Sequence, residues 1–431
     1  MLTPEDLQNI EDKIKSKITF LNTYATTRIV QEMESVMSKL NKNTNKTVFM
    51  QEVNKRASAL FDFIRSDVKS QKVKLDKEVK QSFYEAAGKI NYENEVFTHK
   101  VAKTLDKEIK LPELPKNDAE ITKASDLSLT PKEQKALDNA YKETQKEIEN
   151  ITRTMPLAGQ QTYINACNKA YYDVQNGIDL NTAIVNAIKD VSAQGITTVQ
   201  YNGRNDSIEV AIARAVRSGV NHAACESSII RCNELGANFV RVSQHLGARV
   251  TPFNDYTNHS WWQGKIYHLD WSDANLSKYD TTDQERNEID KRHRYVNEVN
   301  DALKVLQEEF NKYPDFVKTC GYGDIQGIAG VNCRHTFAPF YPGISVQTEK
   351  PLNKEENEKR YRETQTQRAM EVQIRKLKKQ KEALAGYQND SAEMKAAKAD
   401  INRKIKDKSN QYAQYCKEHN LPQANWRLQI S

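Results

Sequence analysis

The sequence predicts a mainly α-helical protein with a small α+β module, in which long amphipathic helices flank a Gly/Pro-rich, β-containing head domain. Two observations predict this fold class. Apolar residues recur in steps of three and four along both ends of the chain, which is the period of an amphipathic helix. Alternating apolar and polar residues, together with a dense group of glycines and prolines, are confined to a segment that begins near residue 237.

Residues 1–110 are interpreted as an N-terminal helical arm. The first helix has clear start signals, because Thr3 can cap it and Pro4 suits the first helical position. It runs from residue 5 to about 40, and its apolar stripe consists of Leu7, Ile10, Ile14, Ile18, Leu21, Ile29, Met33, Val36 and Leu40. The polar segment "NKNTNK" then ends this helix. A second helix follows, with an apolar face formed by Phe49, Val53, Ala57, Leu60, Ile64 and Val68.

The middle of the chain divides into a linker, a helical domain and the α+β module. Residues 111–130 contain "LPELPKNDAE", a proline-punctuated connector. Residues 131–236 form the helical domain, where two helical stretches end at glycine, as helices commonly do. Residues 237–346 form the module. Its expected elements are strands in "NFVRVSQH", in "WWQGKIYHL" and from Cys333 to Phe337, and a helix over residues 284–312.

Residues 347–431 predict a C-terminal helical hairpin that turns near Gly386. Each arm is roughly 40 Å long at about 1.5 Å per residue. Its two apolar stripes consist of Met370, Ile374, Leu377 and Leu384, and of Met394, Ala397, Ile401, Ile405, Tyr412 and Tyr415. The basic run "RKLKKQKEAL" in the first arm is interpreted as a solvated helix face, with phosphate contact as the alternative.

Composition excludes several classes of protein. Lys+Arg 64 against Asp+Glu 58 gives a formal net charge of +6, which is nearly balanced and does not indicate a dedicated nucleic-acid binder. We expect no membrane span, because no run of about 18 apolar residues occurs, and no signal peptide. The six cysteines are scattered without a CxxC motif, which is typical of a reduced protein made in the cytoplasm.

The reactive side chains concentrate in the module, and their residue types suggest a metal site. If "NCRHTF" is extended, Cys333 and His335 point to one face and Arg334 to the other. Together with His245 and His259, they would supply the four ligands of a Cys/His site for zinc, and no other cofactor is expected. The C-x-H spacing is not a common zinc spacing. The alternative is that Cys333 packs in the core while His335 holds the loop by hydrogen bonds.

A second hypothesis is metal-free phosphodiester cleavage, which needs two groups that shuttle protons and a cation for the phosphate. The candidates are His245, His259 and His335 for the protons, and Arg249, Lys265 and Arg334 for the phosphate. A Cys333–His335 nucleophile pair is less favourable, because such neighbours on a strand diverge.

Two further motifs have structural interpretations. The run "GYGDIQG" lacks the strand and helix of a nucleotide-binding turn, so its glycines are interpreted as turn-makers. We expect Trp261 and Trp262 to be divided between the core and an interface, with stacking on nucleic-acid bases as the alternative.

Three ordered motifs, "VSQHLGAR", "HSWWQGKIY" and "GVNCRHTFAPFYPG", resemble the phage minor capsid protein 2 family, related to Mu F-like phage head morphogenesis proteins. Flanking stretches such as "GRNDSIEVAIARAVRSGVN" and "YCKEHNLP" fit the same family in the same order. The resemblance covers about residues 130 to 425. Besides the four candidate ligands, it carries over a motif core of Gly247, Arg249, Trp262, Gln263, Gly264, Lys265, Asn332, Arg334, Pro339, Pro342 and Gly343.

The resemblance implies a structural and non-enzymatic role. We expect a low-copy component of the tailed-phage head, made in the host bacterial cytoplasm and located inside the capsid near the portal. It would act in head assembly or DNA delivery. Its expected partners are the portal protein and other head proteins, with packaged DNA as a further candidate, several copies per virion and no membrane. The alternative function is a co-packaged nuclease or hydrolase that uses a cluster of His245, His259, His335 and Arg334.

Overall fold

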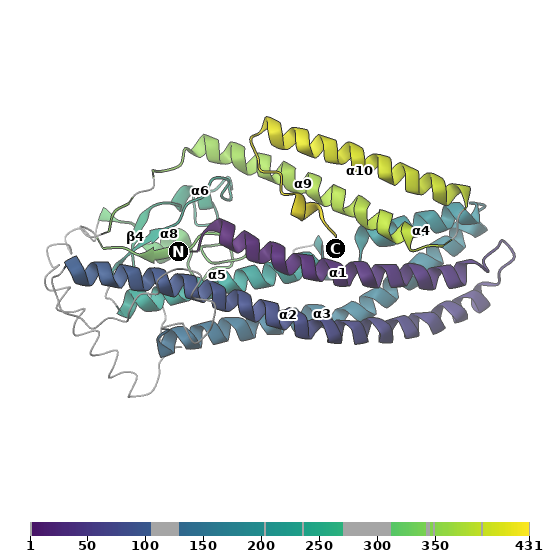
Figure 1. Cartoon of the computed structure of the whole chain (residues 1–431), viewed down its shortest axis with the longest axis horizontal. Coiled ribbons are helices and arrows are strands. Elements are labelled where there is room, and N and C mark those ends of the chain that lie inside the picture. The colour runs from purple at the N-terminus through teal and green to yellow at the C-terminus, as the bar shows by residue number, and fades with distance from the viewer. Residues whose placement is uncertain are drawn as a thin grey trace. The chain divides into compact units, whose positions relative to one another are not determined.

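The computed structural model confirms a mainly α-helical chain with a small β-containing module (Figure 1). It describes residues 2–104, 129–201, 204–234, 237–269, 312–341, 345–347, 350–388 and 391–430. The long helices are α1 (Pro4–Met37), α2 (Lys46–Thr104), α3 (Pro131–Gln175), α4 (Leu180–Gln194), α5 (Ile208–Glu234), α9 (Lys354–Ala385) and α10 (Ala392–Glu418). The shorter elements are β1 (Thr197–Tyr201), β2 (Arg204–Ser207), β3 (Phe239–Val242), α6 (His259–Trp262), β4 (Ile266–His268), α8 (Phe316–Cys320), β5 (Phe337–Pro339) and the 3-10 turn η5 (Asn425–Leu428).

The chain divides into two compact units, and each is built from separate stretches of sequence. Unit 1 consists of Met1–Glu11, Glu78–Gln145 and Arg214–Arg362. Unit 2 consists of Asp12–Lys77, Lys146–Ala213 and Glu363–Ser431. Each unit therefore draws on several of the five sequence-based parts, whose boundaries remain a prediction.

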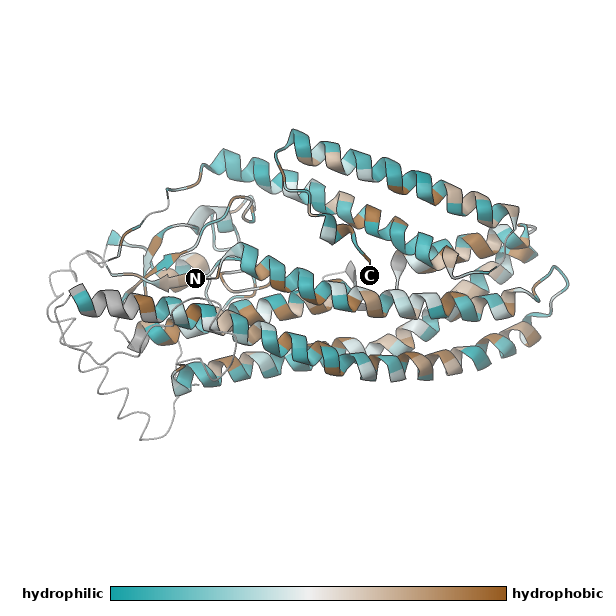
Figure 2. Ribbon diagram, viewed as in Figure 1, coloured by the Kyte–Doolittle hydropathy of each residue, from teal (hydrophilic) through white to brown (hydrophobic). Residues whose placement is uncertain are grey.

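The apolar stripes of the first two helices lie in the interior, as their periodicity predicts. In unit 2, Ile14, Ile29 and Met33 of α1 and Val53 of α2 are fully buried. Figure 2 shows brown, hydrophobic residues recurring along these helices between teal, hydrophilic ones. The chain itself therefore covers these stripes.

The predicted C-terminal hairpin is present: α9 and α10 lie side by side and run in opposite directions (Figure 1). Ile374 packs with Tyr412 and Cys416 in a small apolar cluster of unit 2. The segment after α10 is held by side chains of α9, because Gln367 donates to the Pro422 carbonyl at 2.8 Å and Arg375 donates to the Arg427 carbonyl at 2.7 Å. Side chains of α9 thus hold residues 422–427 against the hairpin, and we call this segment the C-terminal strap.

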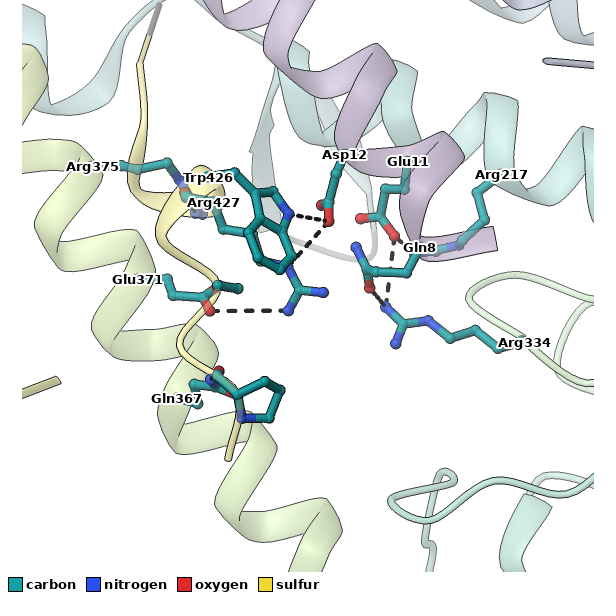
Figure 3. A network of polar contacts seen from close by, with 12 residues as sticks. Gln8, Glu11, Asp12, Arg217, Arg334, Gln367, Glu371, Arg375, Trp426 and Arg427 are labelled. Atoms are coloured by element: carbon teal, nitrogen blue, oxygen red, sulfur yellow. Dashed lines mark hydrogen bonds and ion pairs between the residues drawn. The ribbon is translucent and has the colours of Figure 1, made fainter. Parts of the chain in front are cut away.

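The strap also contacts the part of α1 that belongs to unit 2. The Trp426 indole donates to Asp12 Oδ2 at 3.1 Å, and Arg427 Nε lies 3.2 Å from the same oxygen (Figure 3). One carboxylate therefore receives both an indole N–H and a guanidinium. This places η5 against α1 within unit 2.

The interpretation of the basic run as a solvated face is wrong for two of its residues. Arg375 is turned inward onto the C-terminal strap. Lys379 pairs with Glu209 of α5, whose side chain is only 3% exposed. A buried carboxylate needs a counter-charge, and α9 supplies it in unit 2.

The Glu209–Lys379 pair predicts a specific dependence of stability on pH. Burial alone would raise the pKa of Glu209, but the Lys379 ammonium and its hydrogen bond outweigh this and lower the pKa below its ordinary value of 4.5. A lowered pKa in the folded state stabilises the fold above pH 4.5, and this contribution is lost as the pH falls through the folded pKa. At neutral pH, Glu209→Gln should therefore lower the free energy of unfolding by about 1–3 kcal/mol.

Urea denaturation of wild type and Glu209→Gln at pH 7 and at a pH below 4.5 tests this expectation. The difference in free energy of unfolding between the two proteins should shrink as the pH falls below 4.5, where the unfolded chain takes up a proton at position 209. It should be smallest below the still lower folded-state pKa, where both folded proteins carry a neutral side chain there. An unchanged difference would contradict the assigned role of the pair.

Unit 1 contains a three-stranded antiparallel sheet in the order β4-β3-β5. Val240 of the central strand lies opposite both Tyr267 of β4 and Pro339 of β5. The strands are shorter than predicted: β3 ends at Val242, and Trp261 and Trp262 belong to α6 instead of a strand. The strand expected from Cys333 begins only at Phe337, so Cys333 and His335 lie in the loop before β5.

A two-stranded antiparallel hairpin of β1 and β2 interrupts the predicted helical domain. The sequence carries a signal for it, since Asn202–Gly203 follows the β-prone run "TTVQY". The helix expected over residues 284–312 lies almost entirely outside the described residues, and so does most of the linker. Among the described helices, none is long and apolar enough to cross a membrane.

Candidate metal centre

The loop before β5 alternates its side chains as an extended segment does, although it is not a strand. Cys333 and His335 are fully buried on one side. Arg334 and Thr336 turn to the other side, toward the first residues of the chain. Thr336 Oγ1 donates to the Leu2 carbonyl at 2.8 Å, and Arg334 donates to Gln8. The alternation predicted from "NCRHTF" is therefore confirmed.

A polar network in unit 1 fixes the outward side of this loop (Figure 3). Glu11 of α1 pairs with Arg217 of α5 and lies 3.7 Å from Arg334 Nη2. Arg217 also donates to the Asn332 side chain. Two guanidinium groups thus share one carboxylate, and Arg334 is held at α1. The structure does not bring it to the histidines.

On the inward side, three possible ligand atoms converge. One ring nitrogen of His259, one of His335 and the Cys333 Sγ all lie within 4.8 Å of one another. Cys333 Sγ and His335 Nδ1 are 3.7 Å apart. His259 is positioned by α6, which begins at this residue, whereas the other two come from the loop before β5. All three side chains are at most 2% exposed, so the cluster is closed to bulk solvent.

Hydrogen bonds define the tautomer of each buried ring. His259 Nε2 lies 2.9 Å from the Gln326 carbonyl oxygen. His335 Nε2 lies 3.1 Å from Gln263 Oε1, which also accepts from the His245 backbone N–H at 2.9 Å. An oxygen of this kind only accepts, so both Nε2 atoms must carry the proton. In the neutral rings, Nδ1 is then the unprotonated nitrogen.

Asn357, in the first turn of α9, braces the loop that holds these residues. Its Oδ1 accepts from the backbone N–H groups of Gly247 and Ala248, at 2.8 and 3.0 Å, and from Gln263 Nε2 at 3.5 Å. The Gln263 amide is therefore oriented from both ends. This orientation is what presents Oε1 to His335.

His245 lies beside the cluster but does not join the three converging ligand atoms. Its ring stacks on that of His335, with centroids 4.5 Å apart and planes at 27°. Its Nδ1 lies 3.4 Å from the Leu246 carbonyl. Stacked rings direct their nitrogen lone pairs alongside one another instead of toward a common point. The structure thus brings together three of the four predicted ligands.

Burial keeps the buried rings and the thiol neutral. It lowers the pKa of His259 to about 3, with a further contribution from the positive charge of Arg249. Burial also lowers the pKa of His335 well below its ordinary value and raises that of the Cys333 thiol. Neutral imidazole is the form that binds a metal, whereas a thiol must first lose its proton.

The remaining motif residues shape the surroundings. Arg249 donates to the carbonyls of Gln326 and Val331, at 3.1 and 2.6 Å, and so closes the turn beside His259. Lys265 Nζ donates to the Trp261 carbonyl at 2.7 Å. Gly264 has a φ of +69°, a left-handed conformation that favours glycine, and a Cβ there would crowd the Gln244 side chain.

The tryptophan pair divides as predicted in one respect: Trp262 is completely buried and Trp261 is 41% exposed. The indole of Trp262 donates to the Tyr256 carbonyl at 2.9 Å. Pro339 ends β5, and Pro342 and Gly343 lie outside the described residues.

Sequence reasoning missed three residues that support the cluster. Gln326 supplies a backbone carbonyl, which side-chain identity cannot reveal. Asn357 lies in the polar first turn of α9, where no sequence motif sets it apart. Asn221 of α5 donates to the Cys333 and His335 carbonyls at 3.3 and 3.4 Å, and it lies at the end of the family-like stretch "AVRSGVN".

Comparison with known proteins gives consistent matches. The family model described as phage minor capsid protein 2 matches residues 69–414. A structural protein of Lactococcus phage mv4 is 33% identical over 88 residues, which cover 20% of this chain and 71% of that protein. A structural protein of Lactococcus phage LL-H is 32% identical over 102 residues, which cover 23% of this chain but only 27% of that protein. No solved structure matches the chain.

These matches place the chain among phage structural proteins. The chain belongs to the phage minor capsid protein 2 family, because the match spans most of its length. This confirms the resemblance seen in the three motifs of the module.

Proposed function

We propose that this chain is a low-copy, non-enzymatic component of the tailed-phage head that binds the portal protein from inside the capsid and acts in head assembly or DNA delivery. Family membership supports a head protein. The names of the two phage relatives, both structural proteins, agree with this. The portal is the partner that the proposal adds.

An exposed aromatic patch on α1 and α2 is the observation that carries the proposal. We define the patch as the exposed Phe20 and Tyr24 and the half-buried Phe63, all in unit 2. Phe20 is 51% and Tyr24 46% exposed, and their rings stack with centroids 6.3 Å apart. Phe63 lies 5.8 Å from Tyr24, and Arg28 lies over the Phe63 ring at 5.0 Å. Adjacent exposed aromatics beside an arginine are typical of protein–protein interfaces.

The reactive side chains support a structural role as well. The histidines of the cluster hold backbone carbonyls and amides of their own unit, and Arg334 pairs with α1. The rival nuclease or hydrolase would need a guanidinium beside the histidines that can turn its N–H groups to phosphate, whereas Arg249, which lies near them, donates to the carbonyls of Gln326 and Val331. The arrangement instead favours a braced head domain that presents its helices to partners.

Co-expression with the portal protein of the same phage, followed by mass measurement of the purified complex, tests the proposal. Wild type should form a complex of fixed stoichiometry with the portal ring. Phe20→Ser combined with Tyr24→Ser should weaken binding by about 2–4 kcal/mol, because two interface aromatics are lost.

Val73→Ser is the matched control, since Val73 lies on α2 at 72% exposure and outside the patch. It should bind as wild type does. A well-folded wild-type chain that forms no complex with the portal would overturn the proposal. If the double variant binds the portal as tightly as wild type does, the aromatic patch is not the surface that contacts the portal.

A further inference from the structure

We propose that His259, Cys333 and His335 bind one zinc ion, which clips α6 to the loop before β5. The proposal concerns unit 1 alone and does not depend on the portal contact. It rests on the convergence of three ligand atoms, on the distances between them, and on the hydrogen bonds that orient the rings.

The distances match a tetrahedral zinc site. With zinc bonds of about 2.1 Å to nitrogen and about 2.3 Å to sulfur, a bound nitrogen and sulfur lie about 3.6 Å apart. Cys333 Sγ and His335 Nδ1 are separated by 3.7 Å. Two imidazoles on one zinc have ring centroids about 5 Å apart, and those of His259 and His335 are separated by 5.3 Å at an interplanar angle of 65°.

The hydrogen bonds have the pattern of a metal site. A histidine that binds a metal usually donates its other ring N–H to a carbonyl or carboxylate, which fixes its orientation. Both rings do this here, with Nε2 directed at Gln326 O and Gln263 Oε1. Nδ1 of each ring is left as the nitrogen with a lone pair. Asn357 Oδ1 in turn accepts a hydrogen bond from Gln263 Nε2, so the side chain that orients His335 is itself held in place.

The ligand set selects zinc over harder metals. A thiolate and two imidazoles suit Zn²⁺, whereas Mg²⁺ and Ca²⁺ require oxygen ligands. Zinc binding would release the proton of the Cys333 thiol. The nearby guanidinium of Arg249 favours the thiolate, because a positive charge stabilises it.

His245 is not a ligand in this arrangement. Its centroid distance of 4.5 Å to His335 is shorter than two rings on one tetrahedral ion allow. In this assignment His245 covers the His335 ring. A water molecule takes the fourth position on the zinc ion. This differs from a four-ligand site and is separately testable.

The first measurement is the metal content of the full-length protein, purified without chelator from cells grown with added zinc. We expect about one zinc ion per chain and a lower melting temperature after chelation, restored by zinc. Cobalt loading should give the absorption of thiolate-to-cobalt charge transfer. Cys333→Ser should abolish that band, and His259→Gln and His335→Gln should lose the metal.

Three controls separate ligand loss from general damage. Cys320→Ser removes another buried thiol of the same core, and His222→Gln removes a half-exposed histidine of α5. Both should keep the metal. His245→Phe preserves a ring stacked on His335 and should also keep it.

The wild-type result alone can overturn the proposal if a variant fails to fold. Folded wild type without zinc above the buffer background, and without a change in melting temperature on adding zinc, would mean that Cys333 simply donates to His335 in a metal-free core. Cobalt absorption that persists in Cys333→Ser would exclude the thiolate ligand. Loss of zinc in His245→Phe would overturn the three-ligand assignment.

Discussion

Arg231→Met should lower the free energy of unfolding by about 3–5 kcal/mol, because it leaves the buried carboxylate of Glu133 without a counter-charge. The side chains of Glu133 and Arg231 are 0% and 5% exposed. Arg231 reaches both carboxylate oxygens, with Nη2 at 3.0 Å and Nε at 3.3 Å. Bidentate pairing of this kind is the strong form of an ion pair.

Glu133 also caps α3, which increases the loss in free energy of unfolding that we expect for Arg231→Met. It closes the N-terminus of α3 as a capping box: Thr130 N donates to Glu133 Oε2 at 2.9 Å, and Glu133 N donates to Thr130 Oγ1 at 3.3 Å. Ser227 of α5 donates to the same carboxylate at 3.1 Å. A Glu133 displaced toward water would therefore release both the cap and the α3–α5 contact in unit 1.

Urea denaturation followed by circular dichroism measures this loss. Arg403→Ala is the control, because Arg403 forms an ion pair with Asp400 but its side chain is 69% exposed. Exposed pairs contribute about 0.2–1 kcal/mol, so this variant should be nearly neutral. Similar losses in the two variants would show that burial of the Glu133 pair does not set its contribution.

The helices of this chain were predictable from the sequence because each depends on a local, periodic pattern. The stripe from Leu7 to Leu40 repeats over many turns, and Thr3 with Pro4 marks the start of α1. The tail hairpin was predictable for the same reason. What the pattern could not predict is which polar residues are turned inward. Lys379 belongs to a basic run whose charge predicts a solvated helix face, yet Glu209, 170 residues away, pairs with it.

The candidate site was predictable in its residue types and only partly in its geometry. His259, Cys333 and His335 were identified from the "HSWWQG" and "NCRHTF" motifs, and the structure brings them together. Their supports were not predictable, because Gln326 acts through its backbone and Asn357 comes from another part of the chain. Its residue type makes Arg334 a candidate to hold phosphate beside the histidines. The alternation of an extended segment sends it to α1 instead.

The second large effect is expected at the centre of unit 1. Phe316→Ala should lower the free energy of unfolding by about 3–5 kcal/mol, because it removes a fully buried ring and leaves a cavity. The ring packs edge-on against Phe337 at 4.7 Å and contacts Tyr322 at 5.7 Å. These contacts join α8 to β5, the strand that follows the loop of Cys333 and His335.

Two further variants test whether burial and side-chain volume set the effect of Phe316→Ala. Phe253→Ala removes a phenylalanine that is 62% exposed and should change the free energy by less than about 0.5 kcal/mol. Phe316→Leu keeps most of the volume and should lie between wild type and Phe316→Ala. Metal content measured on the same samples adds a second readout. If the aromatic core positions Cys333 and His335 through β5, Phe316→Ala should lower zinc affinity, whereas a retained affinity would mean that the loop is fixed by Asn221 and α1 alone.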